Sequence, residues 1–236
     1  MPPSPNVVDE AALRKDLVLA CRILGANGHG DSIYGHVSAR LDAGRILMKA
    51  HHVGLEEVTE KDILVLGLDG AVLAGAGKRH TEYPIHTEIM RARPDVMAVV
   101  HTHPIHSVAF AARGLTLRPA GHEGCFFWPP EVPVFDEFTD LVRTREQGEA
   151  VARRLGDRPG MFLRNHGIAV AERSLQWATC AAILLEKAAQ VQLLAQPSGD
   201  VTFVHTSEDE AVQKRRIWFD ESIAAMWRYY ARGLER

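Results

Sequence analysis

The 236-residue chain contains only three cysteines, Cys21, Cys125 and Cys180, and no Cys-x-x-Cys pair. An odd number of scattered cysteines favours neither a disulfide framework nor a thiolate zinc site. Because free cysteine is among the most frequently buried residue types, we expect each of the three to be a small apolar residue of the core.

The chain also lacks an excess of charge of either sign. It has 27 Lys and Arg against 30 Asp and Glu, which gives a net charge of −3, and it has no basic stripe or acidic tail. This balance argues against a nucleic-acid partner and against a membrane surface. The apolar runs are short and interrupted by charge, and the first residues lack the apolar region of a signal peptide, so we predict a cytoplasmic protein.

Hydrophobic residues make up 46% of the sequence, enough for a large core in one domain that spans residues 1–236. The predicted strands are residues 36–41, 45–49, 63–68, 71–73, 96–101, 160–163 and 167–171. The predicted helices are residues 8–25, a segment capped by Thr81 that ends near Ala92, 107–113, 143–155, 174–195, and an aromatic C-terminal helix at about 207–233. Because Asp69-Gly70 indicates a hairpin and the order is not strictly βαβ, we predict an α/β fold with a mostly antiparallel sheet covered by helices on both faces.

Histidine, in contrast, is abundant, with twelve in the chain and several close together. His101-Thr102-His103 follows an apolar strand pattern, and alternate residues of a strand share a face, so both imidazoles point to one place. His166 adds a third imidazole between two short apolar segments. Such residues can be hydrogen-bonded structural histidines, but three neutral imidazoles also suit a catalytic divalent metal with an open coordination position.

Glu82 could add an oxygen ligand or a base to these histidines. We expect it in the first turn of its helix, where backbone N–H groups favour the ionised carboxylate. His86 follows one turn later on the same face, and we expect it to support the site as a hydrogen-bond partner instead of binding metal.

Taken in order along the chain, these motifs resemble the class II aldolase and adducin head family. The matching stretches are residues 34–40, 79–86, 91–103 and 164–167. The resemblance implies a three-layer α/β/α fold, a homotetramer with sites between neighbouring subunits, and bound Zn²⁺ or Mn²⁺. It also implies that His101, His103 and His166 are the metal ligands and that Glu82 acts as acid and base.

The chain departs from the family members that act on sugar phosphates. Where those carry Gly-Asn, Ser-Gly and Ser-Ser, this sequence has Gly35-His36, His51-His52 and His80-Thr81. Imidazoles beside Arg79 replace the small hydrogen-bond donors that surround a phosphate, and such donors suit carboxylates on a flat ring. The chain therefore looks more similar to the decarboxylase branch of the family, which acts on hydroxylated aromatic or pyridine dicarboxylates such as dihydroxyphthalate and hydroxy-methylpyridine dicarboxylate.

We accordingly predict a metal-dependent carbon–carbon lyase, a decarboxylase with a small carboxylated substrate, in which Glu82 or His80 protonates the ring carbon. The predicted substrate-binding residues are Arg79, His36, His51, His52, Arg216 and Tyr229, the last two being candidates to reach a neighbouring site. Phe126, Phe127 and Trp128 could form pocket walls, although each is more typical of a core residue. A phosphosugar or hydroxy-keto-acid aldolase, a sugar-phosphate epimerase or dehydratase, and a non-catalytic adducin-like assembly module remain as alternatives.

Overall fold

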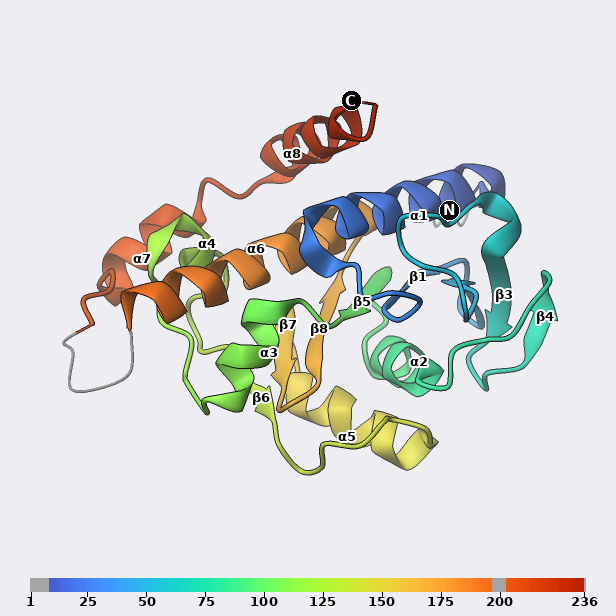
Figure 1. Ribbon diagram of the computed structural model, residues 1–236, viewed down its shortest axis with the longest axis horizontal. Coiled ribbons are helices and arrows are strands. Elements are labelled where there is room, and N and C mark those ends of the chain that lie inside the picture. The colour runs from blue at the N-terminus through green and yellow to red at the C-terminus, as the bar shows by residue number, and fades with distance from the viewer. Residues whose placement is uncertain (1–8, 197–202, 236) are drawn as a thin grey trace, which may run out of the picture.

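The computed structural model describes residues 9–196 and 203–235, and its centre is an eight-stranded sheet (Figure 1). The strands are β1 (His36–Arg40), β2 (Arg45–Lys49), β3 (Ile63–Gly67), β4 (Val72–Ala74), β5 (Ala98–Thr102), β6 (Val134–Phe135), β7 (Gly160–Leu163) and β8 (Gly167–Glu172). Their order is β4-β3-β2-β1-β5-β8-β7-β6. Every neighbouring pair is antiparallel except β6 and β7, so the predicted, mostly antiparallel sheet is confirmed.

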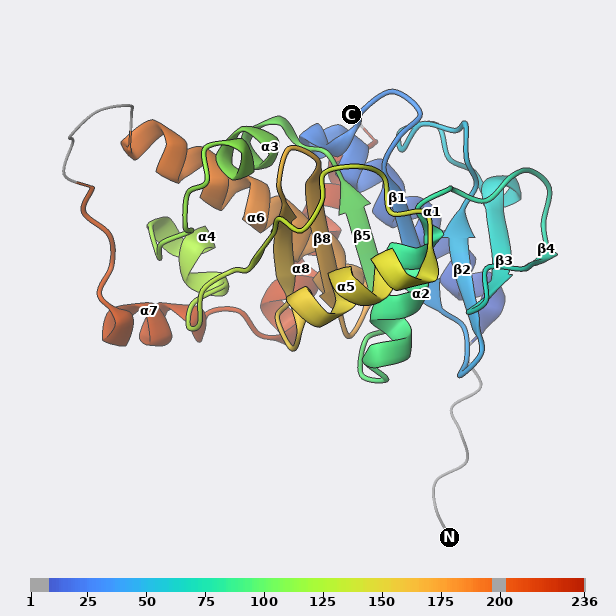
Figure 2. The same ribbon diagram turned by 90° about the horizontal axis from the view of Figure 1, so that it is seen from below.

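Helices cover both faces of the sheet, as the sequence predicts. The helices are α1 (Glu10–Leu24), α2 (Tyr83–Ala92), α3 (Ile105–Ala112), α4 (Gly121–Phe126), α5 (Arg145–Leu155), α6 (Leu175–Ala195), α7 (Glu208–Arg215) and α8 (Asp220–Gly233). One apolar cluster lies between the sheet and α1 and α6, and a second lies between the sheet and α2 and α5 (Figures 1 and 2). The predicted three-layer α/β/α arrangement is therefore confirmed.

The helix starts follow local capping chemistry. The Asp9 carboxylate accepts hydrogen bonds from the first turn of α1, and the Thr144 and Ser174 hydroxyls do the same for α5 and α6. The start of α2 differs from the prediction, because Glu82 and not Thr81 occupies the N-cap position, and its side chain makes no capping hydrogen bond. Pro84 in the first turn of α2 needs no N–H partner, so the helix starts without that bond.

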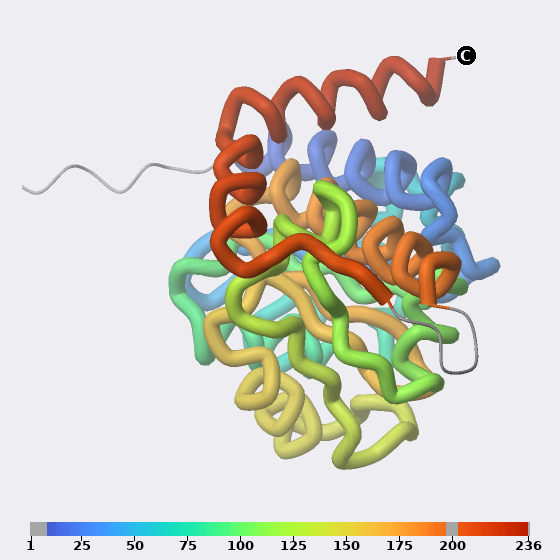
Figure 3. The backbone as a smooth tube through the Cα atoms, turned by 90° about the vertical axis from the view of Figure 1, so that its left-hand side faces the viewer, coloured from blue at the N-terminus to red at the C-terminus, as the bar shows by residue number. Residues whose placement is uncertain are grey.

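The predicted single C-terminal helix is wrong, because the structure has two helices, α7 and α8, which meet at a bend (Figure 3). The Ser222 hydroxyl accepts a hydrogen bond from the Phe219 N–H, which starts a new helix at Asp220. The Asp220 carboxylate also binds Arg173 and Trp177 at the start of α6. These contacts fix the direction of α8 independently of α7.

Two elements, α4 and β6, were not predicted, since six and two residues are too short to show a clear period. The longest helix, α6, has the length and apolar composition of a membrane span, but 67% of its most apolar window is buried. Its buried residues belong to the main apolar cluster, so α6 packs as the central helix of a globular core.

Candidate metal centre

Four predicted residues from distant parts of the chain meet at one end of the sheet. His101 lies near the end of β5, His103 follows that strand, His166 lies in the turn between β7 and β8, and Glu82 precedes α2. Because β5 and β8 are neighbouring strands, His101 and His103 lie at the same end of the sheet as His166. One potential ligand atom from each of the four residues lies within 4.8 Å of the others.

The hydrogen bonds of His101 and His103 fix which nitrogen of each ring is free. The Nδ1–H of His101 donates to the carbonyl oxygen of Ile168 at 2.9 Å, and the Nδ1–H of His103 donates to the Asp31 carboxylate at 3.1 Å. Each Nε2 atom therefore carries a lone pair. The two Nε2 atoms face each other at 3.1 Å, and two lone pairs at this distance repel each other, which favours a cation bound between or beside them.

His166 and Glu82 complete this arrangement. The Nε2 atom of His166 is buried without a hydrogen bond and lies 3.5 Å from Glu82 Oε1, while Glu82 Oε2 lies 3.7 Å from His101 Nε2. Ligands about 2.0–2.1 Å from a tetrahedral zinc ion are themselves about 3.3 Å apart. The spacing and the donor set of these residues therefore fit a divalent cation.

The protonation of the four residues also favours a cation. Burial, together with the neighbouring His101 and His166, lowers the pKa of His103 to about 3. Burial raises the pKa of the Glu82 carboxyl, but its contacts with His101 and His166 outweigh this and hold the pKa below its usual range. At neutral pH the lone pair of His103 is therefore free and the Glu82 carboxylate is ionised, which are the forms that bind metal.

A cavity of about 720 Å³ has Glu82, His103 and His166 of this cluster in its lining. Three further predicted residues line it as well, namely His36, His51 and His80. The His80 Nε2–H donates to the carbonyl oxygen of Ala50 at 3.1 Å, and burial lowers the pKa of His80 to about 2. Burial also lowers the pKa of His36 and of His51. Among the described residues that line the cavity, no lysine or arginine occurs.

Four other predicted substrate residues do not line this cavity. Arg79 is exposed, with its guanidinium 4.3 Å from the centre of the Tyr83 ring. His52 is exposed and lies beside His51, with the ring centres 4.0 Å apart, and Arg216 is exposed at the end of α7. Tyr229 lines a second cavity of about 670 Å³, which lies between the segment after α1 and the helices α3, α6 and α8 and shares Gly28 and Ile105 with the first.

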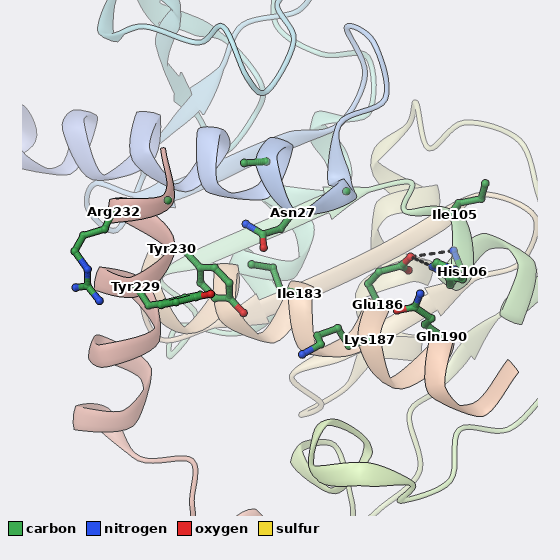
Figure 4. Close-up of a pocket in the computed structure, with 13 residues that line it drawn as sticks. Asn27, Ile105, His106, Ile183, Glu186, Lys187, Gln190, Tyr229, Tyr230 and Arg232 are labelled. Atoms are coloured by element: carbon green, nitrogen blue, oxygen red, sulfur yellow. Dashed lines mark hydrogen bonds and ion pairs between the residues drawn. The ribbon is translucent and has the colours of Figure 1, made fainter. Parts of the chain in front are cut away.

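Figure 4 shows this second cavity, with Tyr229 and Tyr230 of α8 at one side and Glu186 and His106 at the other. The aromatic side chains that could have formed pocket walls are instead buried in the core, namely Phe126, Phe127 and Trp128. The walls of the cavity beside the metal cluster come from imidazoles, from the Tyr34 ring and from aliphatic side chains such as Val108 and Leu141.

Several residues that shape the site were not predicted in these roles. Asp31 orients His103 from 72 positions away, and no local motif marks it. His86 is a hydrogen-bond partner within the site, as predicted, but its partners His36 and Ser38 could not be named from the sequence. Glu186 lies inside the predicted helix 174–195, and its carboxylate accepts hydrogen bonds from the first turn of α3, directly after the His103-Pro104 segment.

Comparisons with known proteins agree with this geometry. A family model described as Class II Aldolase and Adducin N-terminal domain matches residues 15–193. The chain is 35% identical over 203 residues to a 3,4-dihydroxyphthalate decarboxylase of Arthrobacter keyseri, covering 80% of this chain and 81% of that protein. It is 32% identical over 233 residues to the same-named enzyme of a Terrabacter species, with 93% and 95% covered. Its fold is similar to that of the L-fuculose 1-phosphate aldolase from Glaciozyma antarctica, with a TM-score of 0.84, 25% identity, and 100% and 94% covered.

Proposed function

The chain belongs to the class II aldolase and adducin N-terminal domain family, and from this membership we propose that it is a divalent-metal-dependent decarboxylase. The proposed substrate is a hydroxylated aromatic or pyridine dicarboxylate. The relatives named 3,4-dihydroxyphthalate decarboxylase, which match most of this chain, support this choice of reaction.

One observation about the cavity carries the proposal. Beside the metal cluster, the lining residues offer His36, His51 and His80 as hydrogen-bonding groups but no lysine or arginine. A phosphate dianion is best held by charge-assisted donors such as arginine or by a cradle of backbone N–H groups. Neutral imidazole N–H groups suit the weaker, singly charged carboxylate, and the flat rings suit an aromatic substrate.

His101, His103, His166 and Glu82 would hold Zn²⁺ or Mn²⁺. When bound there, the cation supplies an electrophile that stabilises negative charge on a substrate oxygen as the carbon–carbon bond breaks. The imidazoles that line the cavity hold the carboxylates and orient the ring. Because Glu82 is ionised, it can first accept the proton of the ring hydroxyl.

The remaining steps leave a balanced reaction. Protonated Glu82, or His80, then delivers a proton to the ring carbon that bears the carboxylate, and this gives a non-aromatic ketone form of the ring. The carbon–carbon bond breaks, CO2 leaves, and the electron pair of the broken bond restores the aromatic ring with the negative charge on the ring oxygen. The ring oxygen recovers a proton from water, so the reaction consumes one proton from solution. General acid–base transfer of this kind contributes about 10²–10⁴-fold to a rate.

A second candidate is a class II aldolase that cleaves a phosphosugar or hydroxy-keto acid. The structural likeness to the Glaciozyma antarctica aldolase favours it, and the same metal cluster would serve. The cavity lining argues against it, because it offers no cationic side chain for a phosphate. A non-catalytic adducin-like module would need no metal cluster at all.

Metal analysis and product analysis test the proposal. We expect about one divalent ion per chain, and CO2 release when the protein is offered 3,4-dihydroxyphthalate or a hydroxypyridine dicarboxylate. Aldehyde products from phosphosugars without CO2 release would make the decarboxylase assignment wrong and the aldolase correct. A metal-free, inactive protein would instead support the assembly module.

We further propose that the enzyme is a cytoplasmic homotetramer with its sites near subunit interfaces. Within one chain, the described residues that line the cavity include no lysine or arginine, and neither Arg216 nor Tyr229 is among them. Both side chains are exposed, so either could approach the cavity of a neighbouring subunit.

A further inference from the structure

A buried line of three polar side chains leads to the cavity from the interior of the protein. The Ser38 hydroxyl lies 2.7 Å from His86 Nδ1, and His86 Nε2 lies 2.7 Å from His36 Nδ1. Ser38 and His86 are fully buried, and His36 is only 2% exposed where it lines the cavity. None of these contacts is used to hold the metal or to move a proton in the reaction proposed above.

The proton positions along this line follow from the hydroxyl group of Ser38. Its only hydrogen-bond partner among the described residues is His86 Nδ1. A buried hydroxyl that only accepts would leave its own hydrogen without a partner, which costs free energy, so Ser38 donates to His86 Nδ1. His86 then carries its proton on Nε2 and donates it to His36 Nδ1, because two unprotonated ring nitrogens only 2.7 Å apart would repel each other and this contact lies outside the metal cluster.

The hydrogen bond from His86 determines which nitrogen of His36 is available to a ligand. Since His36 Nδ1 accepts a hydrogen bond, the proton of this ring lies on Nε2, for which the described residues provide no hydrogen-bond partner. The β1–β5 register pairs His36 with His101, and the two ring centres lie 4.9 Å apart. The donor is thus held directly beside the metal cluster.

We propose that Ser38 and His86 are positioning residues that fix His36 as a hydrogen-bond donor to a carboxylate oxygen of the substrate. Carboxylate oxygens only accept hydrogen bonds, so the opposite tautomer of His36 would place two lone pairs against each other. This inference rests on the proposed function, because only the proposed decarboxylase reaction implies a substrate that carries a carboxylate. Helix α2 carries both Glu82 at its start and His86 one turn later, so one helix sets the base and orients the donor.

Nitrogen-15 NMR of the histidine rings in the zinc-loaded protein tests the proton positions without any substrate. The His36 signals are assigned by their loss in His36→Gln. We expect a protonated Nε2 and an unprotonated, hydrogen-bonded Nδ1 in the wild type, and a mixture of tautomers in Ser38→Ala. A proton on Nδ1 of His36 in the wild type would overturn the inference.

A double-mutant cycle tests the role of the line in binding. With 3,4-dihydroxyphthalate as substrate, we expect His86→Phe to raise KM about three- to tenfold, the worth of one oriented hydrogen bond, with a smaller change in kcat and unchanged metal content. In a His36→Gln background, His86→Phe should raise KM no further. Equal increases in both backgrounds would show a merely structural role and overturn the inference.

Thr87→Val is the matched control for this cycle. Thr87 is fully buried in the same helix, but its hydroxyl contacts Tyr83 and Glu88 and not His36. We expect its KM to stay at the wild-type value. If the wild-type protein releases no CO2, the proposed function is wrong. The NMR experiment needs no substrate and still shows which nitrogen of His36 carries the proton, so failure of the proposed function and failure of this inference can be told apart.

Discussion

Glu82 holds the N-cap position of a helix, where Ser, Thr, Asp and Asn side chains usually bond to the first turn, and its own side chain makes no such bond. It is the N-cap residue of α2, yet its carboxylate accepts a hydrogen bond from the Val142 N–H at 2.9 Å and lies against His101 and His166. An N-cap hydrogen bond is worth about 1 kcal/mol, so the start of α2 is less stable by about that amount than it would be with a capping side chain. In return, the Glu82 carboxylate places a negative charge at the metal cluster.

We expect Glu82→Gln to lower kcat about 10²–10⁴-fold, the usual contribution of one acid–base group, because an amide cannot carry the transferred proton. The three imidazoles should keep the metal, which elemental analysis of the purified variant would establish. Loss of the metal would instead identify Glu82 as an essential ligand, and unchanged turnover would contradict the acid–base role.

Glu88→Gln is the matched control for this variant. Glu88 is 4% exposed in the same helix, but its carboxylate pairs with Arg91 at 3.0 Å on the side away from the cluster. We expect near-wild-type turnover from it, so that a loss specific to Glu82 is not mistaken for damage to α2.

Among single residues, the sequence predicts those whose spacing along a strand places their side chains on one face. It does not predict residues whose partners are distant in the sequence. The His101-x-His103 pair could be predicted because alternate strand residues share a face. Asp31 and the carbonyl group of Ile168, which set the ring tautomers, lie 72 and 67 positions from their partners. Only the folded sheet brings them together.

Among the elements, the start of α3 depends on a side chain from another helix. The Glu186 carboxylate of α6 accepts hydrogen bonds from the backbone N–H groups of His106 and Ser107 and from the Ser107 hydroxyl. It thereby acts as the cap that α3 lacks, since Pro104 at its N-cap position has no capping side chain. The segment that it fixes begins one residue after His103.

We expect Glu186→Gln to lower the free energy of unfolding by about 1–3 kcal/mol, because the neutral amide weakens charge-assisted bonds and leaves buried N–H groups poorly paired. Zinc affinity should fall as well, since the His103 segment loosens. Urea unfolding and metal titration measure both effects.

Lys187→Gln provides the control at the next position of α6. Lys187 is half exposed and pairs with Glu123 at 3.2 Å, and a surface pair of this kind is worth about 0–1 kcal/mol. A loss of metal affinity in this variant equal to that in Glu186→Gln would contradict a specific role of the cap.

The helices and strands that could be predicted are those in which apolar residues recur with a regular period over several residues. The strands β2 and β7 have the predicted bounds, and α6 begins one residue later than the predicted helix 174–195 and ends at the predicted residue. The break between α7 and α8 could not be predicted, because it depends on the contact of Asp220 with Arg173 and Trp177. Tertiary contacts of this kind override local periodicity.

Over the whole molecule, buried neutral histidines make stability depend on pH. Burial lowers the pKa of His29 to about 4 and of His86 to about 3, whereas an unfolded chain titrates near 6.5. As the pH falls below about 6.5, the unfolded chain binds protons that the native state does not. The stability present above that pH is therefore lost on acidification.

We expect the chelator-treated protein to have a smaller free energy of unfolding at pH 5 than at pH 7, with at most about 1.4 kcal/mol per pH unit from each such histidine. Urea unfolding at the two pH values measures this. Replacing buried His29 in His29→Phe should reduce the difference, whereas replacing exposed His205 in His205→Gln should not. Equal stability at both pH values would contradict the titration of buried histidines.

The two halves of the site come from different parts of the sheet. The metal cluster is built from β5, the β7–β8 turn and the start of α2, whereas His36 and His51 lie on β1 and in the segment after β2. Substitutions in the second group can accumulate over generations without removing a metal ligand. Proteins that share this fold can therefore keep the same metal ligands and evolve different substrate specificities. Each needs to change only a few positions, such as those of His36 and His51, that do not bind the metal.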